Sequence, residues 1–389
     1  MRRQIPLTSS YRRRWQWLLR AAGNHWKTLL LLLAILWLYT HHSEQKQAHA
    51  VTDASFALEL SMLVESSKAN HALPLQQAQE LCALHNFDAY PARSEGRKIY
   101  DLFMLNDELD WLEIRLNTMA AYVDYFVIVE SDLTFTARPK PLALRDNWPL
   151  FDKFHDKIIY HQVEDIPLDA TRSWDLEDHQ RNAMYTQVIP RLEGERMTRP
   201  GDVLIVSDVD EILRPATLTL LRNCDFPKRL TLRSQFYYYG FQWLHRGEQW
   251  KHPQATIYDG PERTILPADL RNGEGGSRIA AWWHKADLWN AGWHCSTCFQ
   301  NISDVLTKLA SFSHMSLNRE EFRDPARIVD RVRNGLDLWD REGEVYDKIE
   351  ANEDIPPFLQ KSGDRFSYLL DRDGPNAGFL DYGDIQSGP

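Results

Sequence analysis

The pattern of apolar and polar positions predicts alternating strands and helices from about residue 98 onward. Short apolar runs predict strands at 100–105, 125–129, 157–160 and 202–206. Apolar residues at helical spacing predict helices over 108–121 and 176–192. The continuous apolar run Val203–Val206 is typical of a strand that is covered on both faces. Strands that alternate with helices indicate an α/β fold with a mainly parallel sheet.

Further along, the chain becomes rich in aromatic residues and in residues that favour strands. After residues 216–222 come strand-like aromatic runs at 229–250 and 255–258 and a further aromatic run at 280–293. Two more helices are expected at 304–312 and 325–338. We therefore expect this section to complete a mixed sheet that is flanked by helices.

The first 97 residues differ from the rest in hydropathy and charge. Residues 28–40 form a long uncharged apolar run, and residues 1–27 carry seven basic and no acidic residues. Because basic flanks stay on the cytoplasmic side, the pattern predicts a cytoplasmic tail (1–27), a signal-anchor transmembrane helix (28–40), a stem (41–97) and a lumenal catalytic domain (98–389). A signal peptide cleaved after Ala50 and a buried core helix are the alternatives.

Composition and charge narrow the class of partner. The chain has 389 residues and a formal charge of −10, and because residues 1–27 contribute +7, the rest carries −17. Such an acidic body argues against a nucleic-acid partner, which requires a basic face. A hydrophobic fraction of 43% with 14 Trp, 15 Tyr and 16 Phe indicates a globular chain.

An acidic motif, Asp208-Val209-Asp210, follows the most apolar strand. The carboxyl end of such a strand opens at the crevice where open α/β sheets bind ligands. The period of two of a strand is expected to place both carboxylates on one side, with Val209 facing the other way, and carboxylates so placed repel each other and call for a counter-ion. Mn²⁺ or Mg²⁺ is the simplest counter-ion, because both prefer carboxylate and phosphate oxygens. Two solvated loop acids are the structural alternative.

Two chemistries use such a pair of acids. In sugar transfer from a nucleotide sugar, the pair holds a metal on the diphosphate. In phosphohydrolases of the haloacid dehalogenase type, Asp208 would be the nucleophile and Asp210 the acid/base. About a hundred residues of strand–helix pattern precede Asp208, and aromatic residues suited to sugars follow it. The transferase is therefore favoured.

Several motifs of the chain resemble glycosyltransferase family 17. They are LDWLEIRL at 109–116, FVIVES at 126–131, TFTARPKPL at 134–142, KIIY at 157–160, SDVDEI at 207–212, YGFQW at 239–243, AGWHCSTCF at 291–299 and DRFSYLLD at 364–371. The resemblance implies a GT-A-like nucleotide-sugar fold, UDP-GlcNAc as donor, Mn²⁺ or Mg²⁺, inversion at the anomeric carbon and a glycoprotein N-glycan as acceptor. It also implies a Golgi membrane protein of type II. A catalytically silent carbohydrate-binding relative is a further alternative.

The resemblance also suggests roles for residues of the second half. Asp208 and Asp210 are expected at the metal, with His314 completing its ligands, and Asp304 is expected to be the catalytic base. Lys308, one turn after Asp304, would face the diphosphate. The structural alternatives are a surface histidine, a helix N-cap and a solvated lysine.

Donor-binding candidates come from the ends of the predicted strands and helices. They are Glu130, Ser131, Arg181, Trp293 and His294. For any single tryptophan, packing in the core is the default alternative.

The four cysteines are Cys82, Cys224, Cys295 and Cys298. In an oxidising compartment, Cys295 and Cys298 are expected to form a local disulfide, with a redox pair and half a zinc site as alternatives. Four cysteines allow three connectivities, and the sequence does not choose among them. Asn301 heads the N-glycosylation triplet of the chain, but its place beside Asp304 argues against its use.

Overall fold

The computed structural model describes residues 26–38, 40, 72–91, 96–167, 173–275, 285–311 and 319–387. The chain divides into two compact units, Met1–Asp53 and Ala54–Pro389.

In the first unit, residues 26–38 form a helix with exposed apolar side chains. Within the described part of the chain, no helix has both the length and the apolar character needed to cross a membrane. The prediction of a transmembrane helix at 28–40 is therefore wrong.

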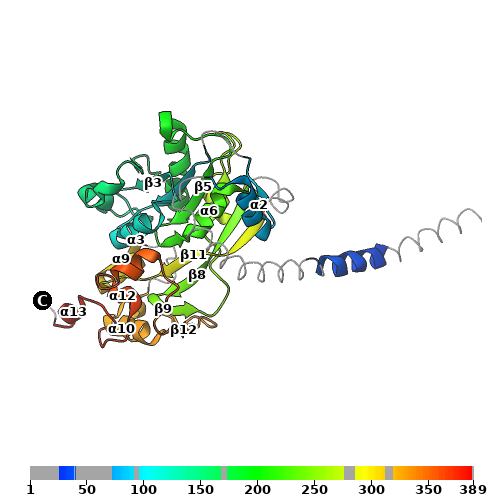
Figure 1. Ribbon diagram of the computed structural model, residues 1–389. Coiled ribbons are helices and arrows are strands. Elements are labelled where there is room, and N and C mark those ends of the chain that lie inside the picture. The colour runs from blue at the N-terminus through cyan, green and yellow to red at the C-terminus, as the bar shows by residue number, and fades with distance from the viewer. Residues whose placement is uncertain are drawn as a thin grey trace, which may run out of the picture. The chain divides into compact units, whose positions relative to one another are not determined.

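The second unit is built on a mixed sheet (Figure 1). Its strands are β2 (Ile99–Met104), β3 (Tyr125–Glu130), β4 (Ile158–Gln162), β5 (Val203–Asp208), β6 (Glu211–Leu213), β8 (Arg229–Tyr238), β9 (Gly240–His245), β10 (Gln254–Ile257), β11 (Lys285–Ser296) and β12 (Tyr346–Lys348). Among the described residues their order is β12-β9-β8-β10-β5-β2-β3-β4, with β11 beside β8 and β6 beside β11. A small separate sheet pairs β1 (Asp88–Ala89) with β7 (Cys224–Asp225).

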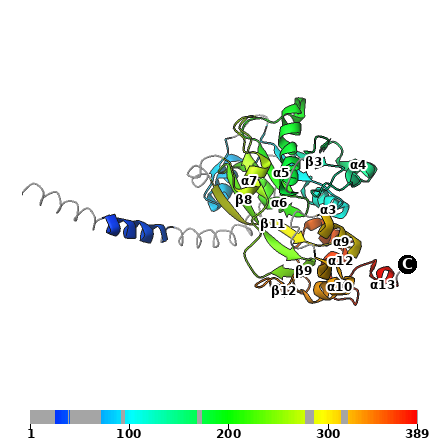
Figure 2. The same ribbon diagram turned by 180° about the vertical axis from the view of Figure 1, so that it is seen from behind.

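Helices flank this sheet. They are α2 (Leu75–Leu84), α3 (Leu109–Met119), α4 (Ala143–Asp146), α5 (Ser173–Ala183), α6 (Pro215–Asn223), α7 (Pro267–Asn272), α9 (Ile302–Ser311), α10 (Pro325–Asn334), α11 (Pro357–Ser362), α12 (Ser367–Leu370) and α13 (Tyr382–Ser387). Helices α3 and α9 lie side by side in both ribbon views, and the indole nitrogen of Trp111 in α3 donates to the carbonyl of Cys298, just before α9 (Figures 1 and 2). The predicted mixed α/β architecture is thus present.

The strands β5, β2, β3 and β4 run parallel, and we call them the parallel half of the sheet. Their side chains alternate between two core clusters. In β5, Val203 and Ile205 belong to one cluster and Leu204 and Val206 to the other. The strand is therefore covered on both faces, as its continuous apolar run predicted.

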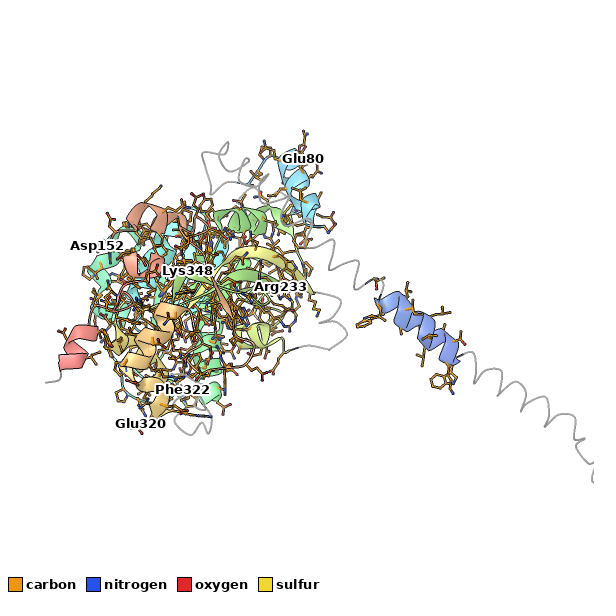
Figure 3. All side chains as sticks on the ribbon, turned by 90° about the horizontal axis from the view of Figure 1, so that it is seen from below. Glu80, Asp152, Arg233, Glu320, Phe322 and Lys348 are labelled. Atoms are coloured by element: carbon orange, nitrogen blue, oxygen red, sulfur yellow. A yellow bond between two sulfur atoms is a disulfide. The ribbon has the colours of Figure 1, made fainter. Side chains whose placement is uncertain are left out.

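Among the strands of this sheet, β8, β9, β11 and β12 carry most of the aromatic side chains, and we call them the aromatic half. Arg233 of β8, which is labelled in Figure 3, binds Asp287 of β11 (2.9 Å), and it lies over the ring of Trp289, 4.3 Å from its centroid. Strand β11 runs parallel to β8 and antiparallel to β6. Through β6 it joins the aromatic half to the end of β5.

Several element boundaries differ from the sequence expectation, among them the helix expected at 325–338, which ends at Asn334 before Gly335. The helix predicted over 176–192 ends as an α-helix at Ala183 and continues as a π-helical turn, Met184–Val188, and a 3₁₀ turn, Ile189–Arg191. Pro190 lacks the N–H that an α-helix would need there. The helix predicted to begin at Asp304 begins at Ile302 instead.

Two disulfides bridge the described cysteines. Cys82 of α2 is joined to Cys224, 142 positions along the chain, so residues of the expected stem are tied to the body. Cys295 is joined to Cys298, which is the local disulfide expected from their spacing.

Candidate functional site

The acidic motif does not continue β5 as an extended strand. The strand ends at Asp208, and Val209 and Asp210 form a turn that leads into β6. The side chain of Val209 is buried in the core, at 4% exposure. The carboxylates of Asp208 and Asp210 therefore face different partners instead of lying side by side, because the turn breaks the period of two.

Asp208 is held by two buried arginines. One carboxylate oxygen accepts a hydrogen bond from Nη1 of Arg181 (3.0 Å), and the other accepts from Nη2 of Arg271. Arg181 also binds Glu177 (2.8 Å), and Arg271 binds Glu211 (2.7 Å). These guanidinium groups supply the counter-charge that the sequence analysis assigned to a metal ion.

Asp210 has a different environment. Its oxygens lie 3.6 Å from Nδ1 of His294 and 3.9 Å from Nζ of Lys308, both beyond hydrogen-bond distance. Burial by itself raises the pKa of this carboxyl, but His294 and Lys308 outweigh burial, so the pKa lies below its ordinary value. Asp210 is thus an ionised carboxylate, and no hydrogen bond to it is found among the described residues.

Beneath the turn lies a fully buried ion pair that the sequence analysis did not single out. Arg115 of α3 binds both carboxylate oxygens of Asp101 in β2, at 2.6 and 2.7 Å. Its remaining N–H groups reach the backbone of the acidic turn. Nη1 donates to the carbonyl oxygens of Asp208 (3.0 Å), Val209 (3.3 Å) and Glu211 (2.7 Å). One rigid guanidinium therefore fixes the turn, and with it the directions of the two aspartates.

Glu211 is also buried and fully engaged. Its carboxylate accepts from the backbone N–H of Asp208 (2.9 Å), from Arg271 and from the indole nitrogen of Trp250 (2.7 Å). Burial alone would raise its pKa, but Arg271 holds the pKa well below its ordinary value. The residue directly after Asp210 thus stabilises the turn instead of facing a ligand. In the sequence, only its position directly after Asp210 could have indicated that Glu211 belongs to the site.

The G-W-H string meets the acidic motif through strand pairing. Gly292, Trp293 and His294 of β11 stand opposite Leu213, Ile212 and Glu211 of β6. A Cβ at Gly292 would clash with the carbonyl oxygen of Ile212 and approach Cα of Leu213 (3.1 Å), so only glycine allows this approach. Two motifs about eighty residues apart in the chain are in this way brought into register.

Alternation along β11 sends the two aromatic residues of this string to opposite faces. His294 points toward Asp210. Trp293 is buried on the other side, where its indole nitrogen donates to Asp354 (3.0 Å) and Arg214 lies over its ring, 4.2 Å from the centroid. Trp293 is therefore a core residue here and does not join the group around Asp210.

Glu130 and Ser131, the donor-binding candidates at the end of β3, also make hydrogen bonds within the fold. The carboxylate of Glu130 accepts from the backbone N–H groups of Leu144 (2.9 Å) and Arg145 (3.2 Å), which begin α4, and the Ser131 hydroxyl accepts from the N–H of Leu133 (3.0 Å). Because β2 separates β3 from β5, these side chains start about 10 Å from the acidic turn. The structure does not bring them together with Asp208 and Asp210.

Helix α9 carries Asp304 and Lys308 on one face. The N-cap role expected of Asp304 is filled by Asp381, whose carboxylate accepts from the N–H groups of Ile302 (2.7 Å) and Ser303 (3.0 Å). Asp304 lies in the first turn and accepts from the side chain of Asn301 (3.0 Å). Burial and neighbouring aspartates raise its pKa, which makes its carboxylate a stronger base.

One further acidic group near Lys308 was missed in the sequence. Glu108 precedes α3, at the carboxyl end of β2, the strand beside β5. Burial and Asp107 raise its pKa to about 7, although Lys308 opposes the shift. Only its place after a strand end distinguishes it in the sequence.

The site fits a divalent cation in part. Within the described residues, no group of three or more His, Cys, Asp or Glu side chains is arranged to hold a metal ion. His314, the predicted third ligand, lies outside those residues. Asp210 nevertheless suits a cation such as Mg²⁺, which is commonly bound through one or two carboxylates plus substrate phosphates.

With this geometry in view, comparison with known proteins identifies the family. The family model for glycosyltransferase family 17 matches residues 24–371. The chain belongs to glycosyltransferase family 17. The match includes the acidic turn, β11 and α9, so the whole site described above lies within the family region.

Curated relatives in this family are similar over most of the chain. The human beta-1,4-mannosyl-glycoprotein 4-beta-N-acetylglucosaminyltransferase is 28% identical over 303 residues, which is 72% of this chain and 56% of the relative. The proteins of that name from Rattus norvegicus (27%) and Mus musculus (26%) match 72% of this chain and 55% of their own length. The chain thus spans about half the length of the curated relatives it matches.

Among solved structures, the inositol-1-phosphate CTP transferase from T. maritima aligns with 51% of this chain and 85% of its own, at 11% identity and a TM-score of 0.24. At that score the likeness carries no argument about fold or function.

Proposed function

We propose that this family 17 protein transfers N-acetylglucosamine from UDP-GlcNAc to a mannose residue of a glycoprotein N-glycan, with inversion. The observation that carries the proposal is the pairing of the acidic turn with the G-W-H strand, which leaves Asp210 ionised and facing Lys308 and His294. The names of the curated relatives supply the sugar and the acceptor class.

Each residue of the site has a proposed task. Asp210, together with His314, would hold Mn²⁺ or Mg²⁺, and the bound cation would stabilise charge on the leaving diphosphate. Lys308 adds a positive charge beside the same carboxylate. Arg181 and Arg271 fix Asp208, so that it orients the donor without acting as a nucleophile. The phosphohydrolase alternative is disfavoured for this reason.

The proposed base is Asp304. In an inverting transfer, the base takes the proton of the acceptor hydroxyl while that oxygen attacks the anomeric carbon from the side opposite the diphosphate. Asp304 is half-buried on the face of α9 that carries Lys308, and its pKa is raised, as a base requires. The two disulfides suit an oxidising compartment, and we propose the Golgi lumen as the place of action.

The full-length chain tests this function directly. UDP release from UDP-GlcNAc is followed with and without a mannose-terminated N-glycan, before and after removal of divalent cations. We expect release that needs both the glycan and Mn²⁺ or Mg²⁺. Glycan binding without UDP release would indicate a silent carbohydrate-binding protein, and a phosphorylated Asp208 would indicate a phosphohydrolase.

Two substitutions separate the roles of the acids. Asp210→Asn is expected to weaken metal-dependent UDP binding, whereas Asp304→Asn should retain that binding and lose turnover by about 100-fold or more. Thermal melting checks that both variants fold. Turnover near the wild-type rate in Asp304→Asn would assign the base elsewhere.

A further inference from the structure

A continuous row of neighbouring aromatic rings leads away from the acidic turn. We call it the aromatic strip. Neighbouring ring centroids along it are 4.7–6.3 Å apart. In spatial order the strip consists of Trp250, His294, Phe236, His245, Tyr346, Tyr238 and Trp339.

Strand register places these rings on one face of the aromatic half. His294 stands beside Phe236 in the β11–β8 pair, and Tyr346 stands opposite His245 in the β12–β9 pair. The intervening residue Tyr237 points to the other face, where its hydroxyl reaches the backbone of Asp354 (3.3 Å). The strip thus follows from the period of two on adjacent strands.

The strip begins at the proposed donor site. His294 lies 3.6 Å from Asp210, and it stacks between Phe236 (5.2 Å) and Trp250 (4.7 Å). Trp250 in turn donates to Glu211. A molecule that lies on the strip would therefore have one end beside the carboxylate that faces the donor.

Core packing does not fully cover the strip. Tyr238 and Tyr346 are buried, whereas Phe236, Trp250 and Trp339 are partly exposed. Partly exposed aromatic faces with nearby polar groups are typical of sites for small organic ligands.

Polar atoms at the edges of the strip point to the same kind of ligand. Among the described residues, Nδ1 of His245, Nδ1 of His294 and Nε1 of Trp339 are buried and make no hydrogen bond. Nδ1 of His252, whose ring centroid lies 5.3 Å from that of Trp250, is also buried and makes no hydrogen bond. Such a group costs about 1–3 kcal/mol when nothing pairs with it, and sugar hydroxyls are suitable partners.

The charges beside the strip are already paired. Nε2 of His245 lies 3.1 Å from Glu344, and Arg341 binds Asp337 (2.7 Å). At these described residues the charges are paired, and such a surface suits a neutral sugar chain better than a phosphorylated or sulfated one.

We infer that the aromatic strip binds the acceptor oligosaccharide, a neutral mannose-containing glycan whose rings stack on Phe236 and Trp250 and whose hydroxyls bond the His245 and Trp339 edges. The inference rests on the proposed function, because the end of the strip at His294 matters only if the donor lies at Asp210. It adds to that function the surface that selects the acceptor.

The test compares Phe236→Leu and Trp339→Leu with Phe358→Leu. Phe358 is a partly buried phenylalanine packed on Phe366, with no ring contact to the strip. The full-length variants are titrated with a mannose-terminated N-glycan and with UDP, and turnover is measured with both substrates. We expect about 10-fold weaker glycan binding and higher acceptor KM in both strip variants, with UDP affinity within twofold of the wild type. Phe358→Leu should leave all three values unchanged.

The outcomes separate this inference from the proposed function. If the wild type transfers sugar and the strip variants bind the glycan as well as it does, the inference is wrong and the function stands. If the wild type binds the glycan through the strip but releases no UDP, the strip stands and the transferase proposal fails. A wild type that binds no glycan overturns the inference outright.

Discussion

In the parallel half of the sheet, buried charges are paired, as Arg115 is with Asp101 and with three backbone carbonyls. In the aromatic half, some rings of the strip, such as Phe236 and Trp250, are partly exposed, and several nitrogen atoms of the strip make no hydrogen bond. A network in which every polar group is hydrogen-bonded is rigid. Polar atoms without a partner are stabilised when a ligand forms hydrogen bonds with them. The comparison indicates that the parallel half holds the acids in place and the aromatic half takes the acceptor.

The largest effect is expected from breaking the parallel half at Arg115. Arg115→Met leaves Asp101 buried and unpaired, and it releases the carbonyls of the acidic turn. We expect the free energy of unfolding to fall by about 3–5 kcal/mol. Urea denaturation measures the loss, and Arg365→Met, at an exposed ion pair, is the control with an expected change below about 1 kcal/mol.

A milder change at the same position separates stability from positioning. Arg115→Lys keeps the positive charge beside Asp101. The lysine ammonium lacks the planar set of guanidinium N–H donors, so it cannot bond the three carbonyl oxygens of the turn in the same way. Turnover should therefore fall more than stability does. A loss below about 1 kcal/mol in Arg115→Met would contradict the role of this network.

A smaller effect is expected where the two halves meet, at Gly292. Gly292→Ala forces a Cβ against the backbone of Ile212 and Leu213, which separates β11 from β6. We expect a destabilisation of about 1–3 kcal/mol and a loss of turnover, because His294 shifts relative to Asp210. Thermal melting and the UDP-release assay measure both. Gly383→Ala, where an added Cβ meets nothing within 4 Å, is the control, and equal melting temperatures for the two variants would refute the argument.

The smallest effect concerns Asp354, which binds Arg214 and Trp293 behind the aromatic half. Burial raises the pKa of Asp354, but Arg214 and the Trp293 N–H outweigh burial, so the pKa is lower in the folded protein. A depressed pKa adds stability above the unfolded value of about 4, and that stability is lost as the pH falls further. We expect unfolding free energies measured between pH 6 and pH 3 to decline less steeply in Asp354→Asn. An unchanged slope would contradict this.

Much of the fold was predictable because local periodicity reports burial. The run at 202–206 predicted a doubly covered strand, and β5 is one. The transmembrane helix at 28–40 was predicted from hydropathy and the basic flank, but within the described residues no helix has the length and apolar character needed to cross a membrane. Hydropathy shows how apolar a segment is, whereas crossing a membrane also requires a sufficient number of consecutive helical residues.

The candidate site was predictable only in part. The acidic motif and the G-W-H string were visible as motifs, but their pairing through β6 and β11 was not, because strand register is a long-range property. Asp208 and Asp210 were expected to share one counter-ion. The turn at Val209 gives them separate cations, Arg181 and Arg271 for the first and Lys308 for the second.

By itself, the sequence determined the α/β class, the position of the acidic motif at a strand end and the membership in family 17 that its motifs indicated. Only the tertiary structure decided that Arg115, Arg271 and Asp381 serve this site, since each acts on a partner distant in the chain. The physical reason is that side-chain periodicity is local, whereas the compensation of a buried charge depends on which elements the fold packs around it.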